Sequence, residues 1–156
     1  MPVFHSRYQA TGEPPVVFHP ELLQGNGPIV QVQLEAPPAL VKSLLSGGGT
    51  APTPVIGPAL IDTGASVSCV DASVPPKLGV NPIGTTHLHG ATGGGASSMF
   101  PMRVVVLNMA NWTLDFQYMV QASLSPLGYV ALLGRDVLRA GSLHYLGHVG
   151  EFQISV

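Results

Sequence analysis

One stretch of the chain, Ala59-Leu60-Ile61-Asp62-Thr63-Gly64-Ala65-Ser66, runs apolar residues into an acid and then into small residues. Leu60 and Ile61 are typical of the end of a buried strand, so the stretch predicts a strand over 55–61 that delivers Asp62 to a tight turn. Gly64 can take the positive φ values that let a backbone fold back under a carboxylate. Asp-Thr-Gly is also good chemistry for an ordinary β-turn, so the tripeptide alone leaves both readings open.

A second stretch, Ala131-Leu132-Leu133-Gly134-Arg135-Asp136-Val137-Leu138, repeats the design of an apolar strand that enters a glycine turn. Between the two stretches, residues 85–91 and 97–107 are rich in β-forming residues and flank the glycine-rich segment 90–95. This pattern predicts a long hairpin whose tip is Gly93 to Gly95, because glycine permits both motion and close backbone approach.

Taken in this order, the Asp-Thr-Gly-Ala-Ser loop, the glycine-rich hairpin and the Leu-Leu-Gly-Arg-Asp turn give a specific pattern. Over residues 28–156 the chain resembles the retropepsin-like aspartic proteases, which are single-domain relatives of pepsin. The resemblance implies a mostly β, retropepsin-like acid-protease barrel with one short helix and half of an active site in each subunit. It also implies an aspartic endopeptidase that acts on extended polypeptides, with the hairpin as a flap.

The resemblance carries roles to individual positions. It implies that Asp62 is the general acid/base and that Thr63 and Gly64 complete the catalytic loop. The substrate-binding positions that it implies are Ala65, Ser66, Ala91, Thr92, Gly93, Gly94 and Gly95. The structural positions that it implies are Gly134, Arg135 and Asp136, the last at a helix start, where acids are favoured.

The chain carries a single Asp-Thr-Gly loop. When two carboxylates share one proton, one can act as the acid while the other acts as the base. We therefore expect a homodimer in which Asp62 meets its copy on a two-fold axis. The resemblance implies that residues 1–8 and 152–156 are interface segments. Many viral members carry an acid where Ser66 stands here, and that acid pairs with the arginine of the later turn. The partner of Arg135 is therefore open, and a catalytically silent dimerisation or peptide-binding module is the alternative function.

Composition excludes several other classes. A chain of 156 residues with 46% hydrophobic and 9% charged residues predicts one compact domain with a real core. The net charge of −2 gives no field that would attract nucleic acid or an anionic membrane. Cys69 is the single cysteine, so no intrachain disulfide forms, and its apolar neighbours indicate a core position. Without a visible export signal or spanning segment, we expect a cytoplasmic protein.

The remaining pattern predicts the organisation of the chain. Residues 1–27 read as an N-terminal extension or interface segment with a short strand at 16–18, and residues 28–156 as the protease-like domain. Alternation predicts strands at 29–34 and 112–120, the latter with Tyr118 on its apolar face. Residues 35–54 read as an insertion with one helical turn at 39–45, and residues 75–82 as a surface segment. Further strands are expected at 67–70 and 130–133, a helix at 135–140, and closing strands at the C-terminus.

Histidines offer one rival chemistry. His87 and His89 fall on one face of a predicted strand, and His144 and His148 form another close pair. Zinc hydrolysis needs three protein ligands and an open coordination position, and no acid lies near the second pair. We therefore predict no metal and no cofactor, and expect ordinary surface or hairpin histidines.

Overall fold

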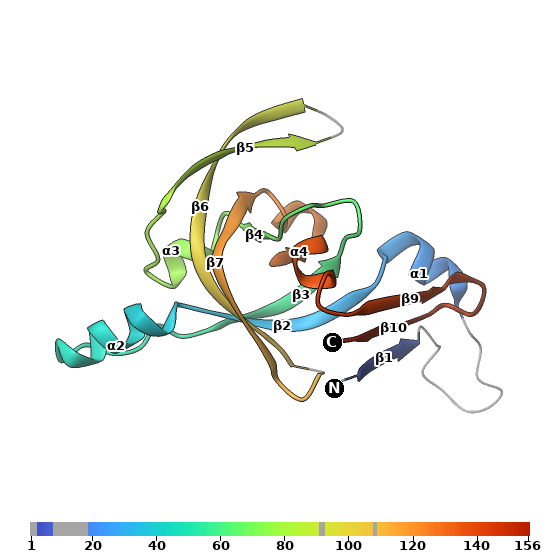
Figure 1. The fold of residues 1–156 in the computed structure, drawn as a ribbon, viewed down its shortest axis with the longest axis horizontal. Coiled ribbons are helices and arrows are strands. Elements are labelled where there is room, and N and C mark those ends of the chain that lie inside the picture. The colour runs from blue at the N-terminus through green and yellow to red at the C-terminus, as the bar shows by residue number, and fades with distance from the viewer. Residues whose placement is uncertain (1–2, 8–18, 91–92, 108) are drawn as a thin grey trace.

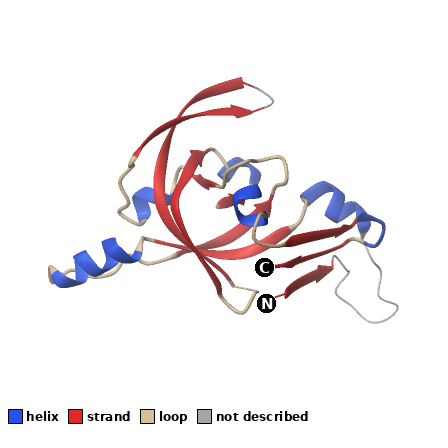
Figure 2. Cartoon of the chain, viewed as in Figure 1, coloured by secondary structure: helices blue, strands red, loops and turns tan. Residues whose placement is uncertain are grey.

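The computed structural model describes residues 3–7, 19–90, 93–107 and 109–156, and strands dominate these ranges (Figure 2). The strands are β1 (Val3–Arg7), β2 (Ile29–Glu35), β3 (Val55–Ile61), β4 (Cys69–Asp71), β5 (Gly84–Gly90), β6 (Gly93–Val106), β7 (Trp112–Ala122), β8 (Ala131–Leu133), β9 (Ser142–Leu146) and β10 (Glu151–Ser155). The helices are α1 (Pro20–Asn26), α2 (Pro38–Ser46), α3 (Val74–Lys77) and α4 (Arg135–Leu138), with 3-10 turns η1 (Ser125–Leu127) and η2 (Gly147–Val149). The expected strand at 16–18 lies outside the described residues.

The larger sheet closes into a barrel. Its strands follow the order β2-β3-β8-β4-β7-β6-β5, and an additional pairing of β2 with β6 joins the ends of a six-stranded ring. Among the strands of the described ranges, β5 stays outside the ring and pairs only with β6, so the β5–β6 hairpin projects from the barrel (Figure 1). The mostly β barrel expected from the sequence is confirmed.

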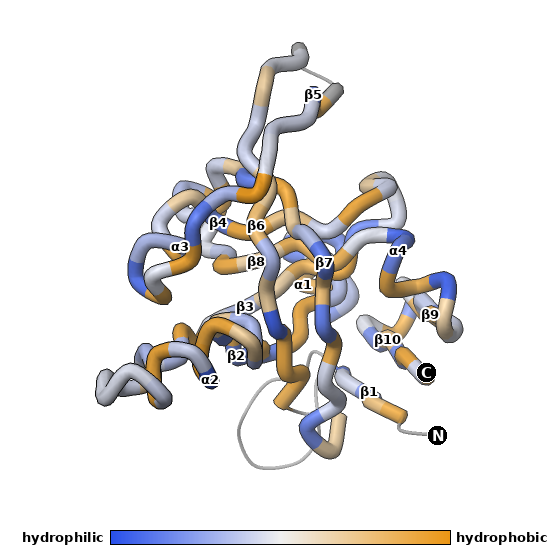
Figure 3. The backbone as a smooth tube through the Cα atoms, turned by 60° about the vertical axis from the view of Figure 1, so that its left-hand side comes forward, coloured by the Kyte–Doolittle hydropathy of each residue, from blue (hydrophilic) through white to orange (hydrophobic). Residues whose placement is uncertain are grey.

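Alternating apolar residues build the barrel interior. Val30, Val32 and Leu34 of β2 are buried, while Gln31 between them is exposed, as the alternation predicted. The main core continues through β3, β6, β8 and β10, and Figure 3 shows hydrophobic stretches along the crossing strands. Helix α1 adds the fully buried Leu23 to the same core, so the N-terminal extension packs against the domain from residue 20 onward.

A bulge in β7 changes which residues face the core. Phe100 pairs with Met119 and Met102 pairs with Phe116, so β7 contains one more residue than β6 between these two pairs. The extra residue reverses the alternation, because side chains in a strand alternate with a period of two. Tyr118 is therefore 42% exposed and Met119 is fully buried, so the prediction that Tyr118 faces the apolar side is wrong.

The two chain ends form a separate three-stranded sheet. Strand β10 lies between β1 and β9 and pairs antiparallel with both, which brings the N- and C-terminal segments together (Figure 1). Glu151 of β10 accepts hydrogen bonds from the Arg7 guanidinium and lies 2.6 Å from His5 Nε2, so β1 is held by charge as well as by its backbone.

Two local expectations need correction. The segment expected to be surface at 75–82 includes most of helix α3 and buries Pro75, Leu78 and Val80, and proline is tolerated there because it lies in the first turn of the helix. The single helical turn expected near 39–45 is the nine-residue helix α2, which projects from the body with no fully buried residue (Figure 1). None of the helices in the described ranges has the length and apolar character that crossing a bilayer requires.

Candidate active site

The acid loop, residues 62–66, begins where β3 ends. Ile61 is buried at the last position of the strand, and the backbone N–H of Asp62 donates to the Leu133 carbonyl of β8 at 2.9 Å. The loop then turns back, so that the N–H of Gly64 donates to Asp62 Oδ1 at 2.7 Å. A Cβ at Gly64 would lie 3.0 Å from that same oxygen, so a side chain there would crowd the carboxylate. Asp62 is only half-buried, so part of this residue is open to solvent.

Strand β8 passes between the two strands that the acid loop connects. It pairs parallel with β3, which enters the loop, and antiparallel with β4, which leaves it. Gly134 follows β8 directly, and a Cβ there would lie 2.8 Å from the Val67 carbonyl carbon and 3.0 Å from the Ala65 oxygen. The glycine is therefore required by the close approach of two backbones.

Arg135 donates hydrogen bonds to backbone carbonyls of the acid loop. Its guanidinium Nη1 donates to the carbonyl of Thr63 at 2.8 Å and to that of Gly64 at 3.2 Å. Its own N–H donates to the Ala65 carbonyl at 2.9 Å. The sequence left the partner of Arg135 open because Ser66 replaces an acid, and these contacts answer the question with backbone carbonyls.

Ser68 and Asp136 tie the same loop to helix α4, and Ser68 was not singled out from the sequence. The buried Ser68 hydroxyl donates to Asp136 Oδ1 at 2.7 Å and accepts from the Gly134 N–H at 3.0 Å. The Ser68 N–H donates to Asp136 Oδ2 at 2.8 Å. The only sign of Ser68 in the sequence was one hydroxyl side chain within residues 67–70, which are otherwise apolar. Both carboxylate oxygens of Asp136 accept hydrogen bonds from Ser68.

The glycine-rich hairpin differs in detail from the expectation. Ala91 and Thr92 lie outside the described residues, and Gly93, Gly94 and Gly95 belong to β6, paired with Gly90, His89 and Leu88 of β5. The prediction that Gly93 to Gly95 form the tip is therefore wrong, because the strand pairing continues up to Gly90 and Gly93. Of the remaining expected substrate contacts, Ala65 is half-buried and Ser66 is exposed, both on the acid loop.

A second apolar cluster connects the hairpin with the acid loop. We call it the hairpin-base cluster; it comprises the buried residues Cys69, Val120 and Leu124, with Val67, Leu88, Met99, Ala122, Tyr129 and Leu132 packed against them. Leu88 and Met99 come from the two strands of the hairpin, whereas Val67 and Cys69 directly follow the acid loop. Burial, together with the charges of Asp136 and Asp62, raises the pKa of the Cys69 thiol to about 11, so this thiol is un-ionised at neutral pH.

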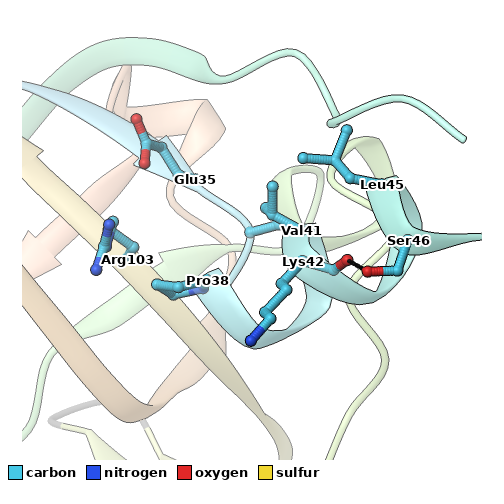
Figure 4. A pocket seen from close by; sticks show the side chains of 8 residues that line it. Glu35, Pro38, Val41, Lys42, Leu45, Ser46 and Arg103 are labelled. Carbon is cyan, nitrogen blue, oxygen red and sulfur yellow. Dashed lines mark hydrogen bonds between the residues drawn. The ribbon is translucent and has the colours of Figure 1, made fainter.

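One further pocket lies apart from Asp62. A pocket of about 380 Å³ lies between α2 and the paired ends of β2 and β6, lined by Glu35, Ala36, Pro38, Val41, Lys42, Leu45, Ser46 and Arg103 (Figure 4). No residue of the acid loop borders it. Within the described part of the chain, no group of three or more His, Cys, Asp or Glu side chains is placed to hold a metal ion.

Comparisons with known proteins identify a matching family and similar solved structures. The retroviral aspartyl protease family matches residues 25–144. Among solved structures, the chain is similar to the EIAV protease complexed with the inhibitor HBY-793, with 19% identity, a TM-score of 0.46 and coverage of 72% of this chain and 86% of that one. It is also similar to the Simian Foamy Virus (mac) protease, with 14% identity, a TM-score of 0.43 and coverage of 72% and 92%. No curated protein sequence matches the chain significantly. The family match covers well over half of the residues, and the chain belongs to the retroviral aspartyl protease family.

Proposed function

We propose that this protein is an aspartic endopeptidase that hydrolyses peptide bonds in extended polypeptides as a homodimer with one Asp62 per subunit. The proposal rests on the geometry of the acid loop. Its half-buried carboxylate is held by the Gly64 N–H, while Arg135, Gly134 and Leu133 fix the backbone beneath it.

The proposed chemistry needs a second carboxylate. Two acids at contact distance cannot both ionise readily, so one carries a proton while the other is a base. The ionised Asp62 accepts a proton from the attacking water, and its protonated copy donates to the peptide group. Because one chain supplies a single such loop, the second Asp62 comes from another copy related by a two-fold axis. Thr63 is exposed on the same loop, and in the proposed dimer its hydroxyl hydrogen-bonds to the partner loop.

The terminal sheet is the interface segment that we favour. Within the described ranges, β1 and β9 are its outer strands and pair on one side only, so each keeps an open backbone edge. Val3 of β1 is 49% exposed, and Tyr145 and Leu146 of β9 are 47% and 40% exposed, which adds apolar surface to that sheet.

The β5–β6 hairpin is the proposed flap. It projects beyond the barrel (Figure 1), and Gly94 and Gly95 on its second strand are exposed and carry no side chain that would keep a substrate away from the backbone. A substrate in extended conformation pairs its main chain with such strand edges, and closure of the flap excludes water from the reaction.

The domain organisation follows as part of the proposal. Residues 1–27 form the extension or interface segment, and residues 28–156 form the protease domain with its insertion at about 35–54. Helix α2 accounts for residues 38–46 of that insertion.

A peptide library incubated with wild type, Asp62→Asn and Asp115→Asn tests the activity. Asp115 is a matched acid that pairs with Arg103 on the outer surface. We expect cleavage at mildly acid pH by wild type and Asp115→Asn, abolished in Asp62→Asn and blocked by a statine-type transition-state mimic. Peptide binding without cleavage by any variant would instead identify a silent peptide-binding module. Specific activity should also fall on dilution as dimers separate.

A further inference from the structure

Helix α2 has an apolar face that the barrel covers only in part. Leu40 and Val41 pack against the main core. Leu44 and Leu45, four residues further along, are 36% and 55% exposed. Residues four apart lie on the same face of a helix, so the apolar stripe continues past the point where the barrel ends. A helix of nine residues is marginal in water unless its apolar face is packed, so the second half of this stripe is open to a packing partner.

Both ends of α2 are well formed. Pro38 lies in the first turn, where proline is favoured because no hydrogen bond from its nitrogen is needed. At the other end the Gly49 N–H donates to the Leu44 carbonyl at 2.9 Å, and Gly48 between them has a φ of +79°. This left-handed turn is a common end of a helix. Local contacts therefore keep α2 formed although none of its residues is fully buried.

The pocket of Figure 4, which we call the α2 pocket, borders this face. Val41 and Leu45 line it together with Ala36 and Pro38, so much of its wall is apolar. Its volume of about 380 Å³ suits a large apolar side chain. Figure 1 shows α2 at the opposite end of the body from the terminal sheet, so a dimer joined through that sheet leaves the α2 pocket uncovered.

The charges around the α2 pocket are unevenly compensated. Arg103 donates to the Asp115 carboxylate at 2.7 and 2.9 Å, and it lies opposite Glu35 in the paired strands β6 and β2. Lys42 is the only charged residue in the segment 36–61, and no carboxylate of the described residues forms an ion pair with it. Figure 4 shows its ammonium and the Glu35 carboxylate pointing in different directions. Lys42 is therefore the counter-charge that the pocket offers to an incoming acid.

We propose that the α2 pocket is a docking site for a segment of another protein in which a large apolar residue lies next to an acidic one. The apolar side chain fills the space beside Val41 and Leu45, and the carboxylate pairs with Lys42. No residue of the acid loop borders the pocket, so this docking does not rest on the proposed peptidase activity.

A displayed library of short random peptides is the probe. The target is the full chain carrying Asp62→Asn, so that bound peptides are not cleaved, and the counter-target adds Leu45→Asp. We expect the enriched peptides to share a large apolar residue beside Asp or Glu. Leu45→Asp should raise the Kd of these peptides at least about 10-fold, because it places a charge in the apolar wall. Leu127→Asp is the control at an exposed leucine outside the pocket, and it should change Kd less than about 2-fold.

Exchange of charge tests the role of Lys42. Lys42→Glu should raise the Kd of a selected peptide about 5- to 20-fold, because two acids then face each other. Replacing the acid of the peptide by lysine should restore binding to Lys42→Glu and weaken binding to the unchanged pocket. Lys77→Glu, at an exposed lysine of α3, is the matched control and should leave Kd nearly unchanged. Enriched peptides without an acid, or no rescue by the lysine peptide, would overturn the proposal.

Sedimentation velocity distinguishes a second copy of this chain as the occupant. Leu45→Asp should leave the association state of the protein unchanged, whereas loss of a dimer or larger species in that variant would show that another copy covers the face and would overturn the proposal. Leu45 and Lys42 are exposed, so circular dichroism should show that their variants fold like the wild type. A library that yields no peptide separating the target from Leu45→Asp would also overturn the docking site, whether or not the wild type cleaves peptides.

Discussion

Replacing Ser68 by alanine removes the hydroxyl that connects the acid loop to α4. That hydroxyl donates to the carboxylate of Asp136 at 2.7 Å and accepts from the buried N–H of Gly134 at 3.0 Å. A hydrogen bond to a charged group contributes about 1.5–3 kcal/mol, and a buried N–H left without an acceptor costs about 1–3 kcal/mol. Asp136 Oδ1 keeps the Val137 N–H, so we expect Ser68→Ala to lower the free energy of unfolding by about 2–4 kcal/mol.

Urea unfolding followed by circular dichroism measures this loss. The midpoint should fall with an unchanged slope, and Tm should drop by about 5–15 °C, given about 2–4 °C per kcal/mol for a chain of this size. Ser46→Ala is the matched control, because Ser46 is exposed and donates only to the Lys42 carbonyl within α2. We expect that variant to lie within about 0.5 kcal/mol of wild type. A loss below about 1 kcal/mol for Ser68→Ala, or equal losses for both variants, would refute the reasoning.

Three further predictions concern the same region. Gly134→Ala should destabilise the fold by about 1–3 kcal/mol or more, because its Cβ would lie 2.8 Å from the Val67 backbone. Gly25→Ala is the control: its Cβ would have no neighbouring heavy atom of the described residues within 4 Å, so the same urea assay should show a neutral or slightly stabilising change. Burial raises the pKa of Asp71, but hydrogen bonds from Ser73, Ser125 and Leu124 outweigh it and hold the folded-state pKa below its ordinary value of 3.8. The stabilising effect of Asp71 is therefore complete above that pH and is lost as pH falls through the lowered value. The free energy of unfolding should therefore decline below about pH 4, and less steeply in Asp71→Asn; equal slopes would count against this linkage. A thiol reagent at about pH 8 should label Cys69 only after denaturant is added, because burial raises its pKa; prompt labelling of the native protein would contradict that placement.

Much of the barrel was predictable because its strands follow simple patterns. The alternation at 29–34 and the apolar approaches to Asp62 and Gly134 each needed only local information, and the structure forms β2, β3 and β8 there. The assembly of these strands around the acid loop was expected from the order of the motifs.

The elements that were missed depend on tertiary contacts. The bulge that exposes Tyr118 arises from the pairing of β6 with β7, and an alternation pattern in one strand contains no sign of it. The pairing of β5 with β6 likewise places Gly93 to Gly95 in a strand, although glycines suggest a tip.

The supports of the site were hidden for a related reason. Ser68 and Asp71 are single polar residues beside apolar ones. Exposed polar residues give the same pattern, so the sequence does not show that these two are buried. Their importance comes from donors and acceptors 53 to 68 positions away in the chain, in the 124–130 loop and in α4. The resemblance implied a structural role for Arg135, but its backbone partners could not be predicted from side-chain types.

The central claim is that two copies of the Asp62 loop together form one active site. Native mass spectrometry of the protein with a statine-type inhibitor counts chains and ligands in the same particle. The account predicts two chains with one inhibitor, and weakened binding to the Asp62→Asn dimer. One inhibitor bound to a single chain, or unchanged binding to Asp62→Asn, would contradict it.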